Sequence, residues 1–210
     1  MKRSDLQLYF IMGTANVKNR QPLEILETAL QAGITMFQFR EKGQYALTNE
    51  SYEHFARQCQ NLCRKYNVPF IVNDDLDLAL KLNADGIHIG QDDYPVSLVR
   101  QKIGQMILGV SVHTATELQV ALKYGADYVG IGPIYSTTSK IDAQLPCGRE
   151  FLQQARCMYP QLPIVAIGGI DCQNAPAVIK AGADGVAVIS ALCESKDIQK
   201  TASTFNSLYL

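Results

Sequence analysis

Short apolar runs alternate with longer amphipathic stretches along the chain. The runs are rich in Val, Ile and Leu, and uninterrupted runs of this kind are typical of parallel strands that helices cover on both faces. They lie at residues 6–12, 34–39, 70–72, 86–89, 106–110, 128–131, 164–167 and 185–189. Apolar residues at helical spacing predict helices at 22–31, 48–66, 76–82, 95–103, 114–124, 149–158, 174–181 and 198–207. Eight such units predict an α/β protein with a compact (β/α)8 TIM barrel.

An internal repeat supports the barrel over its main rival, an open doubly wound sheet. That rival usually has fewer strands and one dominant glycine-rich turn, and the sequence contains no GxGxxG motif. Three segments, 83–87, 125–129 and 182–186, each lead from a predicted helix into a strand and carry an aspartate in third place. Because they precede strands, Asp85, Asp127 and Asp184 are predicted to order turns on the face opposite an active site.

Length, charge and cysteine usage narrow the class of protein. A chain of 210 residues fits one barrel, so residues 1–210 are expected to form a single catalytic domain. The net charge of −1 favours neither nucleic acid nor an anionic membrane as a partner. No apolar run approaches the roughly 20 residues that span a bilayer, and the start lacks a signal-peptide pattern. We therefore expect a cytoplasmic enzyme that acts on small molecules.

The six cysteines are scattered, and we expect them to be buried free thiols. Cys59 and Cys63 could form a metal pair. They lie on an apolar stripe at helical spacing, and no second pair of cysteines or histidines follows nearby, so a core position is favoured.

Charged residues gather where the apolar runs end. Three runs end in such clusters, with QFREK at 38–42, NDD at 73–75 and QDD at 91–93. A barrel enzyme builds its site from the loops that follow the strands. Cations and carboxylates at these positions therefore predict a phosphorylated ligand and a divalent metal. Mg²⁺ fits best as this metal, with one ion per subunit.

Each cluster also has a structural alternative. Arg40 and Lys42 could form surface ion pairs, which contribute only ~0–1 kcal/mol. At 73–75 we expect Asp75 to cap the next helix and Asp74 to face the mouth of the barrel. Of Asp92 and Asp93, which precede a proline, one is expected to cap a helix and the other to bind.

The last two strand ends predict a second phosphate site. Gly168 and Gly169 follow the seventh strand, and Ile189 and Ser190 follow the eighth, where barrels often hold phosphate on backbone N–H groups. A tight turn with a capping serine is the alternative. The loop 137–148 is long and rich in Ser and Thr, which predicts a lid in which Lys140 closes over a phosphate, with simple disorder as the alternative.

Taken together, these blocks resemble the thiamine phosphate synthase family, also called thiamine-phosphate pyrophosphorylase. The resemblance covers nearly the whole chain in the order and spacing of the family. The matching blocks are QFREK at 38–42, VNDD at 72–75, ADGIHIGQDD at 84–93, GVSVHT at 109–114, GADYVGIGPIY at 125–135, PIVAIGGI at 163–170 and AGADGVAVIS at 181–190.

The resemblance implies a (β/α)8 enzyme that joins hydroxymethylpyrimidine diphosphate to hydroxyethylthiazole phosphate and releases pyrophosphate. It implies a metal site at Asp74 and Asp93 and catalytic roles for Arg40, Lys42, Lys140 and Ser111. The residues it assigns to the pyrimidine diphosphate are Gln38, Phe39, Arg40, Glu41, Lys42, Asn73, Ser111 and Lys140. The residues it assigns to the thiazole phosphate are Thr137, Thr138, Ser139, Gly169, Ile189 and Ser190.

The family's reaction is a dissociative one in which pyrophosphate leaves first and the thiazole nitrogen attacks the resulting cation. Such a step needs charge neutralisation rather than a nucleophilic side chain, which agrees with the lack of an evident Ser-His-Asp pattern. Two departures occur: the family loop PTxTK reads STTSK at 136–140, and the first strand ends in Met-Gly-Thr at 12–14.

Two alternatives remain open. One is a thiazole tautomerase on the same scaffold, which would use His113 as an acid or base. The other is a non-catalytic sensor of thiamine precursors, which would keep the phosphate site but could lose the metal ligands. Whether the chain forms a homo-oligomer is left open.

Overall fold

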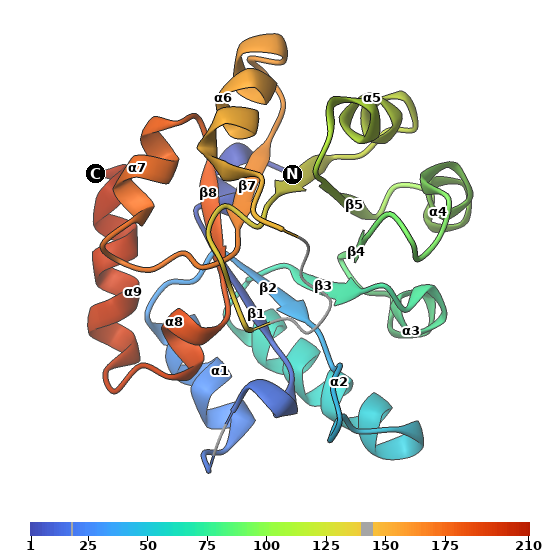
Figure 1. Ribbon diagram of the computed structural model, residues 1–210. Helices are drawn as coiled ribbons and strands as arrows, with labels where there is room; N and C mark the ends of the chain where they lie inside the picture. The colour runs from blue at the N-terminus through green and yellow to red at the C-terminus, as the bar shows by residue number, and fades with distance from the viewer. Residues whose placement is uncertain (18, 140–144) are drawn as a thin grey trace.

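Eight parallel strands form a closed barrel in the computed structural model, which describes residues 1–17, 19–139 and 145–210. Figure 1 looks into this barrel, with the strands at the centre and the helices around them. The strands are β1 (Leu8–Met12), β2 (Met36–Phe39), β3 (Phe70–Asn73), β4 (Gly86–Ile89), β5 (Ile107–Val112), β6 (Tyr128–Ile131), β7 (Ile164–Ile167) and β8 (Gly185–Val188). The predicted (β/α)8 barrel is confirmed, because each strand pairs in parallel with its neighbours and β1 pairs with β8.

Every predicted helix is present in the described part of the chain. They are α1 (Pro22–Gln31), α2 (Asn49–Lys65), α3 (Leu76–Leu82), α4 (Val96–Ile103), α5 (Ala115–Lys123), α6 (Gly148–Met158), α7 (Ala175–Lys180) and α9 (Ile198–Asn206). Sequence reasoning missed α8 (Ser190–Cys193), because four residues are too few to show a helical period. It also started the first strand too early, since a 3-10 turn (Arg3–Leu6) precedes β1.

The core lies between the barrel and its helices. Phe39 points outward from β2, and its ring centroid lies 5.4 Å from Tyr52 and 5.7 Å from Phe55, both on α2. Cys59 and Cys63 lie on the same face of α2, fully buried, as the apolar stripe predicted. All six cysteines are free, but only Cys59, Cys63 and Cys193 are buried, so the expected burial holds for half of them.

The three repeated aspartates lie at the amino-terminal end of the barrel and are structural, as predicted. Each accepts a hydrogen bond from an N–H at the start of the preceding strand: Asp85 from Phe70, Asp127 from Leu108 and Asp184 from Ile164, all at 2.8 Å. Arginines reinforce two of them. Arg100 donates to Asp127 at 2.6 Å, and Arg156 donates to Asp184 at 2.7 Å.

The residues before these aspartates end the helices. Asn83, Gly125 and Gly182 all have positive φ angles of 47°, 78° and 112°, which Gly and Asn adopt most easily. None of the described helices is long and apolar enough to cross a membrane.

Candidate active site

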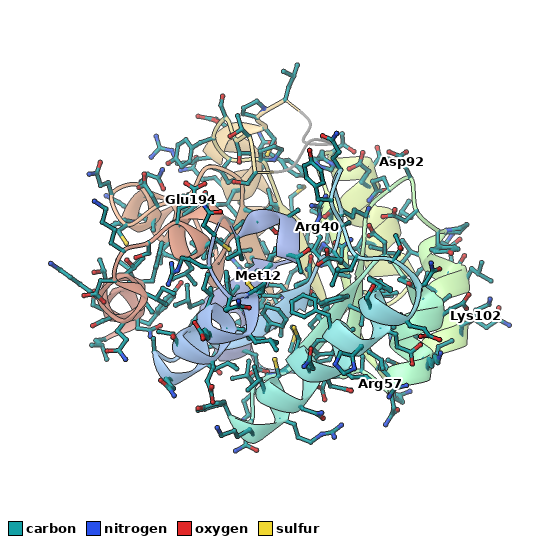
Figure 2. The ribbon with its side chains drawn as sticks, turned by 90° about the horizontal axis from the view of Figure 1, so that it is seen from below. Met12, Arg40, Arg57, Asp92, Lys102 and Glu194 are labelled. Carbon is teal, nitrogen blue, oxygen red and sulfur yellow. The ribbon has the colours of Figure 1, made fainter. Side chains whose placement is uncertain are left out.

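Two adjoining cavities lie at the carboxyl ends of the strands. The smaller, of about 310 Å³, is lined by residues that end or follow β2 to β7. The larger, of about 930 Å³, lies over the loops after β1, β2, β6, β7 and β8. Arg40, Lys42 and Thr137 line both cavities. Figure 2 shows Arg40 between Asp92, which lines the smaller cavity, and Glu194, which lines the larger one.

The QFREK segment divides by side-chain direction. Arg40 and Lys42 face the mouth of the barrel, and Arg40 is only 6% exposed, so its side chain does not lie on the outer surface. Gln38 points the same way one layer deeper, where its Nε2 donates to the Tyr9 hydroxyl at 2.8 Å. Phe39 faces the helices instead, because successive side chains of a strand point to opposite sides.

Glu41 has a loop-fixing role. Its carboxylate accepts hydrogen bonds from the backbone N–H of Thr14 at 2.7 Å and of Leu47 at 2.9 Å, and from the Thr14 hydroxyl. Gln38, Phe39 and Glu41 are therefore not among the described residues that line the two cavities. The loops after β1 and β2 are tied together by Glu41, which holds Lys42 in place.

Asp74 and Asp93 meet in the smaller cavity, as predicted. Burial and then the neighbouring Asp93 carboxylate raise the pKa of Asp74 to about 6, while the Lys42 ammonium, which contacts it, acts in the opposite direction. Asp74 has a φ angle of 61°, a left-handed conformation that is uncommon for a residue with a side chain. Its Oδ2 also accepts from Asn73 Nδ2 at 2.5 Å. The pair is thus crowded with negative charge that one lysine only partly offsets.

This donor set fits a divalent cation. The described residues contain no group of three or more His, Cys, Asp or Glu that could hold a metal ion by themselves. Mg²⁺ does not need one, since it usually binds through one or two carboxylates and takes its other oxygens from water and substrate phosphates. Asp74 and Asp93 are two neighbouring carboxylates of this kind, and both line the smaller cavity.

The predicted division of Asp74 and Asp75 is confirmed. Asp75 caps α3, because its Oδ1 accepts from Leu78 N at 2.9 Å, and its Oδ2 accepts from the Tyr52 hydroxyl at 3.1 Å. The expectation that Asp92 or Asp93 caps the next helix is wrong. Pro95 is the N-cap of α4 and has no side-chain cap, and Asp93 Oδ2 accepts from Gly90 N at 2.7 Å within its own loop.

Ser111 lines the smaller cavity and is paired with a histidine that sequence reasoning missed. His88 Nε2 lies 2.9 Å from Ser111 Oγ, and His88 Nδ1 lies 3.0 Å from the Tyr128 hydroxyl. A serine–histidine pair is therefore present, although the third member is a tyrosine instead of a carboxylate. The sequence did carry one signal: His88 is a polar residue in the apolar run 86–89, which forms β4, and it takes an inward position there.

His113 also lines the smaller cavity, where its ring is held by the next helix. Its Nδ1 lies 3.3 Å from Glu117 Oε2, and the same oxygen accepts from the His113 backbone N–H at 2.6 Å. The ring is thus fixed by a side chain four residues further along the chain, on α5.

The larger cavity collects the residues predicted for the second phosphate except Gly168, which lines the smaller one. Gly169, Ile189 and Ser190 line it together with the segment 136–139. Gly168 and Gly169 have φ angles of 99° and 63°, and a Cβ at Gly169 would lie 2.6 Å from Ser136 O. Only glycine fits here, so the turn after β7 is pressed against the loop after β6.

The loop after β6 contacts the loop after β8 through two serines. The Ser139 hydroxyl donates to Ser190 Oγ at 3.2 Å, and Ser139 N donates to Thr137 Oγ1 at 3.2 Å. Residues 140–144 of the predicted lid, which include Lys140, lie outside the described residues. Thr138 lines the larger cavity with its neighbours.

Comparison with known proteins gives one consistent answer. A family model described as thiamine monophosphate synthase matches residues 8–192. A thiamine-phosphate synthase of Lysinibacillus sphaericus is 67% identical over 99% of this chain and 98% of its own length. One from Anoxybacillus flavithermus is 51% identical over 94% and 91%. A solved thiamine phosphate pyrophosphorylase from Pyrococcus furiosus is 32% identical, covers 98% of this chain and 96% of its own, and superposes with a TM-score of 0.85.

Proposed function

Because the chain belongs to the thiamine monophosphate synthase family, we propose that its two cavities bind the two halves of thiamine phosphate. The chain is a transferase that makes thiamine phosphate. The observation that supports the assignment is the separation at the barrel mouth. The acidic pair and Ser111 line one cavity, the Gly169 and Ser190 turns line the other, and Arg40 and Lys42 line both.

The smaller cavity is proposed to bind hydroxymethylpyrimidine diphosphate. Arg40 and Lys42 offer charged donors to the diphosphate, and Asn73 and Ser111 face the same space. Gln38 lies one layer deeper, and its Oε1 is buried with no hydrogen-bond partner among the described residues. A buried acceptor of this kind is open to a donor from the pyrimidine. Phe39 and Glu41 would act indirectly, by packing and by fixing the loop.

The larger cavity is proposed to bind hydroxyethylthiazole phosphate. Backbone N–H groups at Gly169, Ile189 and Ser190 suit a phosphate, since glycine allows close approach. Thr137, Thr138 and Ser139 add hydroxyl donors from the opposite loop. This arrangement would hold the thiazole ring next to Arg40 and Lys42, where the two cavities meet.

The proposed reaction is dissociative. The bond between the pyrimidine methylene carbon and the diphosphate oxygen breaks, and its electron pair leaves with pyrophosphate. The thiazole nitrogen then donates its lone pair to the cationic carbon and forms the new carbon–nitrogen bond. Arg40, Lys42 and Ser111 stabilise the departing negative charge, and such preorganised donors usually contribute the largest single part of a rate enhancement. Lys140 is assigned the same role by the family resemblance.

Asp74 and Asp93 would hold one Mg²⁺ per subunit, which supplies further positive charge to the diphosphate when bound. Both carboxylates line the smaller cavity together with Lys42 and Asn73, so an ion held there would lie in the space proposed for the diphosphate. The loops at the barrel mouth would have to exclude water from the cationic pyrimidine carbon, because water would otherwise hydrolyse it.

The direct test is incubation of the purified protein with both heterocycles and Mg²⁺, followed by chromatography for thiamine phosphate and pyrophosphate. Equal amounts of both products are expected. Conversion of the thiazole phosphate to an isomer without pyrophosphate release would favour the tautomerase, and binding without any product would favour the sensor. A cytoplasmic location stays a prediction, which cell fractionation would check, and light scattering would measure whether the chain forms a homo-oligomer.

A further inference from the structure

A continuous hydrogen-bond chain crosses the interior of the barrel and ends at the smaller cavity. Gln38 Nε2 donates to the Tyr9 hydroxyl at 2.8 Å, and the Tyr9 and Tyr128 hydroxyls are 2.8 Å apart. The chain continues from Tyr128 to His88 Nδ1 at 3.0 Å and from His88 Nε2 to Ser111 Oγ at 2.9 Å. Its inner members are 7% exposed or less. Five side chains from β1, β2, β4, β5 and β6 are thus linked.

Two glycines make room for this chain. A Cβ at Gly109 would lie 2.3 Å from the Tyr128 hydroxyl and 2.4 Å from His88 Nδ1, and so would clash with both partners of that hydrogen bond. A Cβ at Gly130 would lie 3.2 Å from His88 Cε1. Glycine inside a strand is unfavourable and often marks the close approach of another group. Here the approaching groups are the Tyr128 hydroxyl and the His88 ring.

The protons in such a chain can run in only two ways. A tyrosine hydroxyl has one proton, and a neutral imidazole donates from one nitrogen and accepts at the other. If Gln38 donates to Tyr9, then Tyr9 donates to Tyr128 and Tyr128 donates to His88 Nδ1. His88 must then carry its proton on Nε2 and donate to Ser111. The Ser111 hydroxyl proton is left to point into the cavity, and no acceptor for it is found among the described residues.

The inner end of the chain selects this direction. Reversing it would require Gln38 to accept from Tyr9 and to turn its NH₂ group to the buried place where Oε1 has no partner among the described residues. A buried carbonyl without a partner is tolerated better than buried N–H groups without one. Burial raises the pKa of both tyrosines, so each keeps its proton. A protonated His88 would leave the Tyr128 proton without an acceptor, so the neutral ring is the one that fits.

We infer that the chain from Gln38 through Tyr9, Tyr128 and His88 holds the Ser111 hydroxyl as a hydrogen-bond donor toward the cavity. This makes Tyr9, Tyr128 and His88 positioning residues. The inference rests on the proposed function in one respect, namely that the group Ser111 meets is the diphosphate. A hydroxyl fixed as a donor suits an anion, whereas a freely rotating one would lose part of that interaction to disorder.

The tautomer of His88 is the test that does not depend on activity. Nitrogen-15 NMR of histidine-labelled protein distinguishes the Nε2–H from the Nδ1–H form, and His54→Gln and His113→Gln variants identify the His88 signals. We expect a single neutral Nε2–H tautomer in the unmodified protein and a mixture in Tyr9→Phe. The control Met36→Leu alters the buried neighbour that pairs with Tyr9 in the barrel but carries no polar atom, and it should keep the single form. An Nδ1–H or a protonated ring in the unmodified protein, or an unchanged spectrum in Tyr9→Phe, overturns the inference.

A kinetic cycle then tests the link to Ser111. Tyr9→Phe should lower kcat about fivefold, the factor expected for one neutral hydrogen bond, with little change in KM. In a Ser111→Ala background the same change should have no further effect, because the chain acts through that hydroxyl. An equal loss in both backgrounds contradicts the inference and points to a packing effect. Full activity in Ser111→Ala alone would instead refute the proposed role of Ser111 in the reaction. The NMR test of the His88 tautomer does not depend on that role and would keep its result.

Discussion

Aspartates at the two ends of the barrel are held in opposite ways. At the amino-terminal end, Asp85, Asp127 and Asp184 each accept from a strand N–H, and arginines pair with two of them. At the carboxyl end, Asp74 sits beside Asp93 with a left-handed backbone and a raised pKa. One end uses carboxylates to close turns and the other holds them close together without full neutralisation.

The difference shows that position along the strand, more than residue type, decides what a carboxylate does here. The turn before a strand offers a free N–H group that an aspartate can satisfy. The loop after a strand instead brings side chains from several strands to one space. Crowded like charges lower stability unless a cation is present, and natural proteins keep such arrangements mainly at functional sites.

The largest effect is expected for Asp74→Asn. Removing one carboxylate of the metal pair should lower kcat by about 10²–10³-fold, as the loss of one charge-stabilising group does in other enzymes. The free energy of unfolding should not fall by more than about 1 kcal/mol, since Asn tolerates the left-handed backbone and the contact with Lys42 is partly exposed. Steady-state kinetics with thermal unfolding would check both. Full activity in Asp74→Asn and in Asp93→Ala, with chelator present, would remove the metal from the account.

Lys140→Ala should lower kcat about tenfold to 100-fold and change the affinity for the thiazole phosphate less, because the lysine is proposed to act on the leaving group. Single-turnover kinetics and a separate binding titration with the thiazole phosphate would measure the two effects. Lys196→Ala, on the described surface after α8, serves as a matched loss of charge. Kinetics that match those of the unmodified enzyme would leave Lys140 without a role.

At the opposite end, Asp184→Ala should lower the free energy of unfolding by about 2 kcal/mol and leave kcat unchanged. The carboxylate accepts from Ile164 N and from Arg156, and hydrogen bonds to charged groups contribute more than neutral ones. Asp184→Asn keeps an acceptor and should lose less. Urea unfolding and kinetics at 25 °C would measure both quantities, and a large drop in kcat per folded molecule would break the contrast between the two ends.

The smallest effect is expected for Ser190→Ala. It removes one hydroxyl from the larger cavity and its contact with Ser139, so KM for the thiazole phosphate should rise about fivefold with kcat nearly unchanged. Initial rates at varied thiazole phosphate would check this. A change in KM for the pyrimidine diphosphate alone would show that the cavities are assigned the wrong way round.

Much of the fold could be predicted because apolar residues recur at regular spacing in most of the helices and strands. The bounds of α1 and α3 match the predicted ones, and Asp75 caps α3 as its place before the helix indicated. The short helix α8 and the uncapped start of α4 could not be predicted, since neither leaves a pattern of apolar residues. Where such short or uncapped elements begin and end is decided by local contacts of the backbone and side chains.

The candidate site was predicted less evenly. Strand ends predicted that Arg40, Asp74 and Asp93 lie at the barrel mouth, where they line the smaller cavity, but the continuous QFREK motif hid the alternation that sends Phe39 to the helices. Glu41 looks like a ligand in sequence, yet its partners are backbone groups of two loops, which only the folded chain brings together. His88 was missed because its partners Tyr128 and Ser111 are 40 and 23 residues away.

The most direct test of the central claim is a crystal structure of the protein with pyrophosphate and Mg²⁺. The account predicts one metal ion on Asp74 and Asp93, with the pyrophosphate bound to that ion and to Arg40, Lys42 and Ser111. A metal held elsewhere, or pyrophosphate bound with the two carboxylates turned away from it, would contradict it.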